Sequence, residues 1–351
     1  MRLIRPLYAA RLLAMLLAVG FAVPSGFAEA AAQKKTSTTR RTVRKPTYSA
    51  SASSARKARL ARARAAARAR EEARLRALRE AMTPRYKTDA TGALVPDIRA
   101  AAAVIFNPET GQVLWEENGQ DKRSIASITK VMTALVYLED NPDLNQEIKI
   151  ERSDVYAAST TYLRANDRIS LNDVLHLTLI ASDNAAARAL ARVSHGGTAS
   201  FIERMNEKAI ELGLESTTFA DPSGLNPANI SSAYDLSRLI TFASANETLA
   251  PIMQSASYTA RTHRRAITIR NTNHLVRGGD VDVLGGKTGF IGKAGYCLAT
   301  LLRLPQSNHQ VAVVVLGAAS NNGRFWETRH LFNWLSEKAT DVFGKEQEQA
   351  R

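Results

Sequence analysis

The chain holds a single cysteine, Cys297, among its 351 residues. One thiol cannot close an internal disulfide, so the fold must be stable without one. In the stretch GYCLATLL this cysteine alternates with apolar residues, a pattern that favours a buried, inert thiol on a strand over a catalytic cysteine. Because no cysteine lies near the N-terminal cleavage signal described below, we also expect no lipid-anchored N-terminus.

Clusters with the spacing of metal ligands are missing as well. The six histidines show no such spacing with one another or with the cysteine; they are His176, His195, His263, His274, His309 and His330. We therefore expect no metal ion, and nothing else in the sequence predicts a cofactor.

Long hydrophobic runs are scarce. The N-terminal run Leu12–Val23 has twelve residues, which falls short of the roughly 20 that a membrane-spanning helix needs. It follows the arginines at positions 2, 5 and 11 and precedes the A-x-A sequence Ala28-Glu29-Ala30. Together these features predict an export signal over residues 1–30 and a mature protein that is periplasmic or associated with the cell wall. A retained membrane anchor is the less favoured alternative.

Negative charge is scarce in the N-terminal part of the chain. Residues 1–99 carry 22 Lys and Arg against 6 Asp and Glu, a net charge of +16, whereas residues 100–351 carry 25 against 27, a net charge of −2. The excess lies in a basic arm, residues 31–95, which is first rich in Ser and Thr and then in Ala and Arg. From Ser54 to Met82 the composition favours a helix, but arginines surround every face, so this segment cannot build a core.

The basic arm has two interpretations. In an exported protein the accessible polyanions are cell-wall polymers and lipid head groups, so we expect the arm to bind an anionic wall polymer or membrane surface and expect no nucleic acid partner. The alternative is a solvated linker that holds the rest of the chain away from a surface.

A folded domain is predicted over residues 96–342. Its first strands, AAAVIF and QVLWEE, flank the turn-rich segment Asn107–Gly111 and favour a hairpin. The middle, about residues 150–265, has helical periodicity. Strands return in GGKTGF, GYCLATLLRL and QVAVVVLGAA, before a last helix from about Gly323 to Val342 and a charged tail, residues 343–351. This order predicts a sheet domain interrupted by a helical subdomain, with a site in the cleft between them.

Three polar motifs stand out in this domain: Ser127-Ile128-Thr129-Lys130, Ser182-Asp183-Asn184 and Lys287-Thr288-Gly289. Singly, S-x-x-K and S-x-N are weak signals, because both patterns recur elsewhere in the chain. Their order and setting are more specific. The first motif opens an apolar helix, the second follows the helical stretch LNDVLHLTLIA, and the third lies beside two glycines on a strand.

In this order the motifs resemble those of the serine peptidase and penicillin-binding family, whose S-x-x-K, S-x-N and K-T-G elements surround one cleft. The stretches IASITKVMTA, SDNAAARALA, DPSGLN, NTNHLV and GGKTGF are similar to low-molecular-mass penicillin-binding proteins that act as D-alanyl-D-alanine peptidases, most closely to their D,D-endopeptidase branch. The resemblance spans about Val95 to Val342. It implies an α/β fold, an antiparallel β-sheet flanked by helices with an inserted helical subdomain, as in penicillin-binding transpeptidases and serine β-lactamases.

The resemblance also implies the chemistry. The chain would cleave D-alanyl cross-links between peptidoglycan stem peptides, and β-lactams would inhibit it covalently. Ser127 would be the acylated nucleophile, Lys130 would take its proton, and Ser182 would relay a proton toward the leaving amine. A free lysine has a pKa of about 10.4, so this value must fall by about three units. Desolvation on an apolar helix face and the nearby charge of Lys287 both act in that direction.

Further positions are implied to handle the substrate. The second motif supplies a hydrogen-bonding partner for the lysine and the substrate amide, with Asp183 pointing elsewhere. The K-T-G strand binds the peptide terminus or a β-lactam carboxylate, and its glycine lets the substrate backbone approach. The implied substrate-binding residues are Asn184, Lys287, Thr288 and Gly289, and the implied oxyanion hole consists of the backbone N–H groups of Ser127 and Phe290.

Three other functions stay open. A β-lactamase needs a carboxylate that activates water, but no E-x-x-x-N stretch lies between His195 and Asn229. A non-enzymatic wall-binding protein would not react covalently with penicillin. A D-alanyl-D-alanine carboxypeptidase, which trims pentapeptide stems, is the main alternative. Many such enzymes carry a further β-rich domain, whereas this chain ends at GKEQEQAR soon after its last predicted helix.

Overall fold

A computed structural model describes residues 50–349 except 280 and 306, and describes side chains within residues 54–338. The predicted export signal and the part of the basic arm before residue 50 lie outside the described residues. Among the described residues, no helix combines the length and the apolar composition required to cross a membrane.

The basic arm contains one long helix, α1 (Ala50–Met82), which confirms the helix predicted from Ser54 to Met82. The chain divides into two units at Ala65, within this helix. Among the described side chains of α1, none is buried and nearly all are exposed to water. The helix therefore has no core of its own, as its arginine-covered surface predicts.

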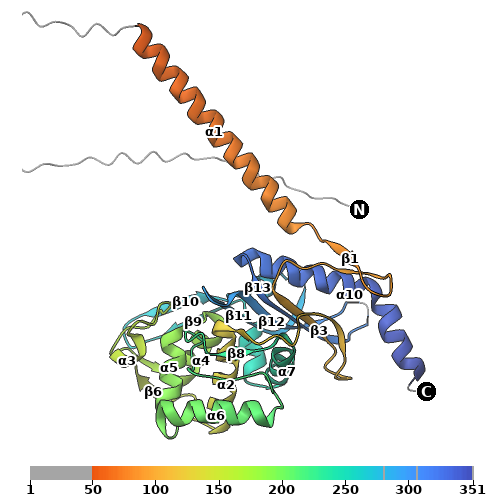
Figure 1. The fold of residues 1–351 in the computed structure, drawn as a ribbon. Coiled ribbons are helices and arrows are strands. Elements are labelled where there is room, and N and C mark those ends of the chain that lie inside the picture. The colour runs from red at the N-terminus through yellow and green to blue at the C-terminus, as the bar shows by residue number, and fades with distance from the viewer. Residues whose placement is uncertain (1–49, 280, 306, 350–351) are drawn as a thin grey trace, which may run out of the picture. The chain divides into compact units, whose positions relative to one another are not determined.

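The centre of the folded domain is an antiparallel five-stranded sheet with the strand order β11-β12-β13-β3-β4 (Figure 1). Its strands are β3 (Ala102–Phe106), β4 (Val113–Glu117), β11 (Asp282–Ile291), β12 (Gly295–Arg303) and β13 (Gln310–Ala318). Strands β3 and β4 form the predicted hairpin, and the last three strands coincide with the predicted closing strands. The sheet thus joins the two ends of the domain, and the helical residues are inserted between them.

Both faces of this sheet are covered by apolar side chains. Along β3, Ala103 and Ile105 belong to one core and Val104 belongs to the other, because successive side chains of a strand point to opposite faces. Helix α10 (Asn321–Gln349) packs on the first face and α7 (Ala233–Ser244) packs on the second. The sheet therefore supports the site with apolar packing on both of its faces.

The inserted residues are mainly helical. They form the 3₁₀ helix η1 (Ala126–Ile128), α2 (Thr129–Glu139), α3 (Arg152–Val155), α4 (Leu171–Ile180), α5 (Asn184–Val193), α6 (Gly197–Glu211), α8 (Leu249–Gln254) and α9 (His274–Gly278). Three short antiparallel pairs connect them: β5 (Arg123–Ser124) with β8 (Ile230–Ser231), β6 (Glu147–Lys149) with β7 (Arg168–Ser170), and β9 (Ser257–Arg261) with β10 (Ala266–Arg270). Helix α2 lies among α4, α5, α6 and α7 and is buried along most of its length.

The start of the folded domain differs from the predicted boundary. Residues assigned to the basic arm contain a small hairpin of β1 (Tyr86–Thr88) and β2 (Leu94–Pro96). This hairpin packs on α10, where the His330 ring contacts Tyr86 edge-on and its Nε2 donates to the Arg85 carbonyl oxygen at 2.8 Å. Most of the hairpin side chains are exposed, so the sequence has no apolar alternation to reveal the two strands.

Helix α10 is longer than predicted. It begins two residues before Gly323 and continues beyond Val342 to Gln349, through most of the predicted charged tail. That tail has no apolar face, but its Glu, Gln and Lys residues are good helix formers. Adding residues to an existing helix avoids the free-energy cost of starting a new one. The tail can therefore be helical although its own sequence has no helical periodicity.

Candidate active site

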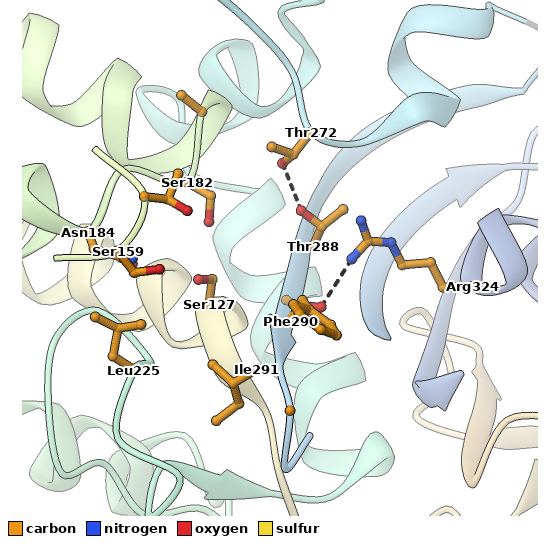
Figure 2. A pocket seen from close by; sticks show the side chains of 14 residues that line it. Ser127, Ser159, Ser182, Asn184, Leu225, Thr272, Thr288, Phe290, Ile291 and Arg324 are labelled. Carbon is orange, nitrogen blue, oxygen red and sulfur yellow. Dashed lines mark hydrogen bonds between the residues drawn. The ribbon is translucent and has the colours of Figure 1, made fainter. Parts of the chain in front are cut away.

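Ser127 lies in η1, the turn that leads into α2. Its neighbours Ala126 and Ile128 are buried, which confirms the apolar helix entrance predicted from the sequence. Ala126 has a φ of 50°, a left-handed conformation that a residue with a Cβ adopts only at an energetic cost. At this turn the Ser127 side chain faces a cavity (Figure 2).

The cavity measures about 430 Å³ and lies between the helical residues and β11. Hydroxyl and amide side chains from separate stretches of sequence meet here, together with apolar side chains. The predicted site residues that line it are Ser127, Ser182, Asn184, Thr288, Gly289 and Phe290. The two predicted lysines, Lys130 and Lys287, lie behind this lining and are almost completely buried. All eight predicted positions thus belong to one region.

Lys130 is placed directly behind the nucleophile. Its Nζ lies 2.9 Å from Ser127 Oγ, 2.6 Å from Asn184 Oδ1 and 2.5 Å from the Ser223 carbonyl oxygen. A neutral amine has two N–H groups and one lone pair. The amide and carbonyl oxygens can only accept, so they take both N–H groups, and the lone pair is left for the Ser127 hydroxyl proton.

The charge state of Lys130 fits that arrangement. Burial lowers its pKa from 10.5 to about 7, while the carboxylates of Asp183 and Asp221 oppose the shift and Arg188 adds to it. Desolvation is therefore the main cause, as predicted, and Arg188 is a further positive neighbour that the sequence did not indicate. The expected repulsion between the two lysines acts on the pKa of Lys287. Near neutral pH a far larger fraction of these amines is therefore unprotonated than the roughly one in a thousand of a free lysine.

The second motif joins α4 to α5. Ser182 has a φ of 60°, and its Oγ accepts a hydrogen bond of 2.8 Å from Lys287 Nζ. Asn184 uses both ends of its amide, because Oδ1 accepts from Lys130 and Nδ2 donates to the Ala158 carbonyl oxygen at 2.7 Å. Each lysine is therefore held by one residue of this motif.

Asp183, between them, points away from the cavity as predicted. Its Oδ1 accepts from the Ala186 N–H at 2.9 Å and caps α5. Its Oδ2 accepts from the Tyr162 N–H at 2.6 Å and from Thr161 Oγ1 at 3.0 Å. The carboxylate therefore holds the loop of residues 156–163 against α5.

Lys287 faces Ser182 rather than the open cavity. Its Nζ donates to Ser182 Oγ at 2.8 Å and to the Thr288 carbonyl oxygen at 2.9 Å. Burial lowers the pKa of Lys287 well below its usual range, and the charge of Lys130 lowers it further. Thr288 is the member of this motif whose side chain lines the cavity, where its Oγ1 donates to Thr272 Oγ1 at 2.7 Å.

Gly289 lines the cavity, and its missing side chain also has a structural role. A Cβ at this position would lie 2.6 Å from the Ile125 carbonyl oxygen, so the glycine lets β11 approach the segment that carries the nucleophile. Gly224 acts in the same way from the DPSGLN stretch. Its φ is +80°, and a Cβ there would lie 2.0 Å from the Ala126 carbonyl oxygen. The two glycines thus let two separate segments approach the backbone directly before Ser127.

Arg324 is a cavity residue that sequence reasoning missed. It projects from the first turn of α10, is 6% exposed, and donates from Nη1 to the carbonyl oxygens of Gly289 at 3.0 Å and Cys297 at 3.2 Å. Burial lowers its pKa to about 10, so it remains cationic at neutral pH. No local motif marks an arginine at this position, because its role arises only when α10 meets the end of β11.

Ser159 and Thr160 also line the cavity and were not predicted. They lie in the loop that Asp183 holds, and the Asn184 N–H donates to the Thr160 carbonyl oxygen at 3.0 Å. Ser159 has a left-handed φ of 59°. The sequence YAASTTYL has neither regular periodicity nor a motif, so nothing in it indicates this placement.

The described lining of the cavity contains no His, Cys, Asp or Glu side chain. Among the described residues, no three His, Cys, Asp or Glu side chains gather in a way that could hold a metal ion. Cys297 is buried on β12 as predicted, and burial raises its pKa to about 11, which keeps the thiol protonated and unreactive.

Comparisons with known proteins agree with this geometry. A model of the peptidase S11 family, described as D-alanyl-D-alanine carboxypeptidase, matches residues 89–320. The D-alanyl-D-alanine endopeptidase of Escherichia coli (strain K12) is 34% identical over 250 residues, which are 70% of this chain and 80% of that protein. The D-alanyl-D-alanine carboxypeptidase DacF of Bacillus subtilis (strain 168) is 31% identical over 235 residues, which are 64% of this chain and 59% of that protein.

A solved structure is similar as well. The crystal structure of the DD-transpeptidase of Streptomyces K15 is 29% identical, with a TM-score of 0.63 over 68% of this chain and 97% of that chain. The antiparallel sheet with flanking helices and an inserted helical part is therefore the fold of this group, as the sequence predicts.

Proposed function

The chain belongs to the peptidase S11 family of serine D-alanyl-D-alanine peptidases, and from this premise we propose that it is a peptidoglycan D,D-endopeptidase acting through an acyl-enzyme on Ser127. The observation that carries the mechanism is the 2.9 Å contact between Ser127 Oγ and Lys130 Nζ, an amine whose pKa is lowered to about 7 by burial. Such an amine is a base near its optimal pKa at neutral pH.

The proposed mechanism assigns each step to a residue of the site. Lys130 takes the proton of Ser127 as Oγ attacks the D-alanyl carbonyl carbon. The backbone N–H groups of Ser127 and Phe290 receive the developing oxyanion, since both residues line the cavity. When the C–N bond breaks, the leaving amine receives through Ser182 the proton that Lys130 took from Ser127, so Lys130 is neutral again; Ser182 Oγ itself accepts a hydrogen bond from Lys287. Water then attacks the ester carbonyl while Lys130 takes the proton of the water, and this proton returns to Ser127 Oγ as the ester C–O bond breaks.

Substrate binding follows from the same lining. Asn184 and Thr288 offer an amide and a hydroxyl to the substrate, and the cationic Arg324 stands beside Thr288 as a partner for a carboxylate. Gly289 contributes by keeping β11 close to Ser127. A β-lactam presents both a reactive carbonyl and a carboxylate, so it fits this lining as a covalent inhibitor.

The endopeptidase assignment is supported by the relatives. The protein named endopeptidase shares a higher identity and a larger part of its length with this chain than the one named carboxypeptidase DacF. Cleavage of D-alanyl cross-links would loosen the wall during growth and so affect cell-wall biogenesis and cell shape. A carboxypeptidase that trims pentapeptides uses the same chemistry and is the second candidate.

The N-terminal residues belong to the proposal too. Residues 1–30 are proposed as an export signal that delivers the enzyme to the periplasm, and residues 96–342 as the peptidase domain. For the basic arm we propose binding to an anionic wall polymer or membrane surface. This is supported by α1, whose described basic side chains are exposed and outnumber its acidic ones.

Two measurements test this function. Intact mass after incubation with benzylpenicillin should show one covalent adduct, and Ser127→Ala, which removes a single oxygen, should abolish it. An adduct that persists in this variant excludes Ser127 as nucleophile. Chromatography of digests should then show that cross-linked muropeptide dimers are converted to monomers faster than free D-Ala is released from monomeric pentapeptides. The opposite preference would establish the carboxypeptidase and leave the acyl-enzyme mechanism intact.

A further inference from the structure

A second pocket, separate from the candidate active site, is lined mostly by cations. It measures about 460 Å³ and lies where the β6–β7 pair meets the turn between β9 and β10. The residues of this basic pocket are Glu147, Lys149, Asn166, Arg168, His263 and Arg264. Two arginines and a lysine thus accompany one carboxylate here, although residues 100–351 as a whole carry a net charge of −2. The proposed mechanism gives this pocket no role.

Lys149 and Arg168 form a like-charged pair across two strands. They stand directly opposite each other in the β6–β7 register, so their exposed side chains lie on the same face. Neither makes an ion pair with another residue of the described part of the chain. Like charges directly opposite each other in an antiparallel pair are destabilising. An anion bound beside both side chains would offset this repulsion.

Donors outnumber acceptors around the His263 ring. Its Nδ1 lies 3.0 Å from the backbone nitrogen of Arg168, and its Nε2 lies 3.0 Å from Arg264 Nε. Both of those neighbours carry a hydrogen, whereas a neutral imidazole has only one nitrogen that can accept. When Nδ1 accepts from the backbone, the N–H groups of His263 Nε2 and Arg264 Nε face each other. An anion with two oxygens can accept from both.

The basic pocket is connected to the active-site cavity through a short route. Arg265, the neighbour of Arg264, donates from Nη2 to the Tyr162 carbonyl oxygen at 2.8 Å. Tyr162 lies two residues after Thr160, which lines the active-site cavity. The two cavities are therefore within roughly 20 Å of each other, a distance that about six extended peptide residues span. Two cross-linked stem peptides are long enough to extend from one to the other.

We propose that Lys149, Arg168 and Arg264 form a second binding site, which takes free carboxylates of a peptidoglycan stem peptide while the cross-link of the same substrate lies at Ser127. Stem peptides carry such carboxylates, and guanidinium groups bind them through paired hydrogen bonds. Phosphate groups bind in the same way, but the short route to the active-site cavity favours the substrate. This inference rests on the proposed function and adds to it a site that selects an extended, anionic substrate.

Direct binding tests this site without requiring cleavage. In a Ser127→Ala background, fluorescence anisotropy measures the Kd of a labelled cross-linked muropeptide dimer. Lys149→Gln combined with Arg264→Gln should raise this Kd about tenfold at low salt, since an exposed ion pair contributes up to about fivefold. The matched control is Lys122→Gln combined with Arg277→Gln, because it also removes one exposed lysine and one exposed arginine, both outside the basic pocket. It should leave the Kd within about twofold.

Two further ligands identify the group that is bound. When the internal stem carboxylates of the dimer are amidated, the Lys149→Gln and Arg264→Gln double variant should change the Kd less than twofold. An equal tenfold rise for amidated and unmodified dimers would refute carboxylate binding. Sedimentation with phosphatidylglycerol vesicles is the other arm. Loss of vesicle binding in the double variant, together with an unchanged Kd for the dimer, would assign the basic pocket to lipid phosphate and overturn the proposal.

Stability and acylation separate this site from misfolding and from the proposed function. Lys149→Gln should not lower the free energy of unfolding, because it removes one of two opposed cations. With Ser127 intact, the double variant should react with benzylpenicillin at a rate within about twofold of the parent, since this small molecule does not span both cavities. If the unmodified protein forms no penicillin adduct, the proposed function itself has failed. An intact adduct with an unchanged Kd for the dimer refutes the second binding site alone.

Discussion

Positive side chains occupy two regions of the molecule under opposite conditions. On α1 the arginines and one lysine project into water from every face of a helix without a core. In the cleft, Lys130 and Lys287 are only 0% and 1% exposed. Burial, and not residue type, decides what these groups do. Exposed cations act through a field that salt screens, whereas a buried amine is driven toward its neutral form and can take part in proton transfer.

Removing the buried amine should have the largest effect. Lys130→Ala should lower the rate constant of penicillin acylation by about 10²- to 10⁴-fold, because the only base within hydrogen-bonding distance of Ser127 Oγ among the described side chains is lost. Time courses of adduct formation by intact mass measure this. Lys122→Ala, an exposed lysine outside the cavity, is the control and should keep the parent rate. A loss below threefold in Lys130→Ala would show that another group takes the proton.

Titrating the same amine should have the next largest effect. The neutral form of Lys130 is the base and its pKa is about 7, so acylation should fall about tenfold for each pH unit below that value and level off above it. A pH–rate profile of adduct formation checks the midpoint. A profile flat from pH 5 to 8 would contradict a neutral lysine base.

The same shift predicts how stability depends on pH. Lys130 has a lowered pKa when folded, so between about 7 and 10.5 the unfolded chain binds one more proton at this residue than the folded chain. The free energy of unfolding should therefore rise with pH across that window. Urea titrations at several pH values measure the slope, and Lys130→Met, which has no proton to bind, should reduce it. An equal slope in both proteins would contradict the assignment.

A smaller effect should follow from changing the charge near the buried amine. The Asp183 carboxylate raises the pKa of Lys130, so Asp183→Asn should move the acid limb of the pH–rate profile to lower pH. It should also cost about 1 kcal/mol of unfolding free energy or more, because asparagine has a single acceptor oxygen and its NH₂ group must replace one of the two oxygens that accept from the Ala186 and Tyr162 N–H groups. Asp121→Asn, an exposed control, should change neither quantity. Movement of the acid limb to higher pH in Asp183→Asn would contradict the effect of this carboxylate on the pKa of Lys130.

The smallest effect on chemistry should come from the exposed cations. Deleting residues 31–78, which spares the β1–β2 hairpin, should leave penicillin acylation within about twofold. It should weaken retention on anionic wall or membrane preparations, most clearly at low salt. Gln is a good helix former, so a variant with Gln in place of Arg56, Arg59, Arg62 and Arg64 should keep the helix. It should reproduce part of the loss of retention. Equal retention of all forms across a salt series would assign the arm to the linker alternative.

Local patterns were sufficient for much of the fold. The helix of the basic arm, the first hairpin, the three closing strands and the apolar helix after Ser127 each show their periodicity or composition within a dozen residues. The β1–β2 hairpin and the extension of α10 lacked such a signal, because exposed strands do not alternate and a polar helical tail has no apolar stripe.

The sequence identified most residues of the site, but it did not predict how their side chains are arranged. The three motifs, with Phe290 directly after the last of them, account for the eight predicted positions, yet Arg324, Ser159 and Thr160 belong to stretches with no motif. The close approach of Gly289 to the Ile125 carbonyl oxygen, which leaves no room for a Cβ, was not predicted either. Such close contacts depend on how two segments that are distant in the sequence pack together. The periodicity of either segment alone does not predict them.

The sequence by itself determined which groups are present, a serine and a lysine three residues apart at a helix entrance, a second lysine on a strand, and a basic arm without a core. Only the tertiary structure decided that both lysines are removed from water, that Asn184 holds one and Ser182 the other, and that Phe290 remains exposed on Tyr296. The physical reason is that a pKa and a contact depend on what surrounds a group in space. Here those surroundings come from residues that lie 50 to more than 100 positions away along the chain.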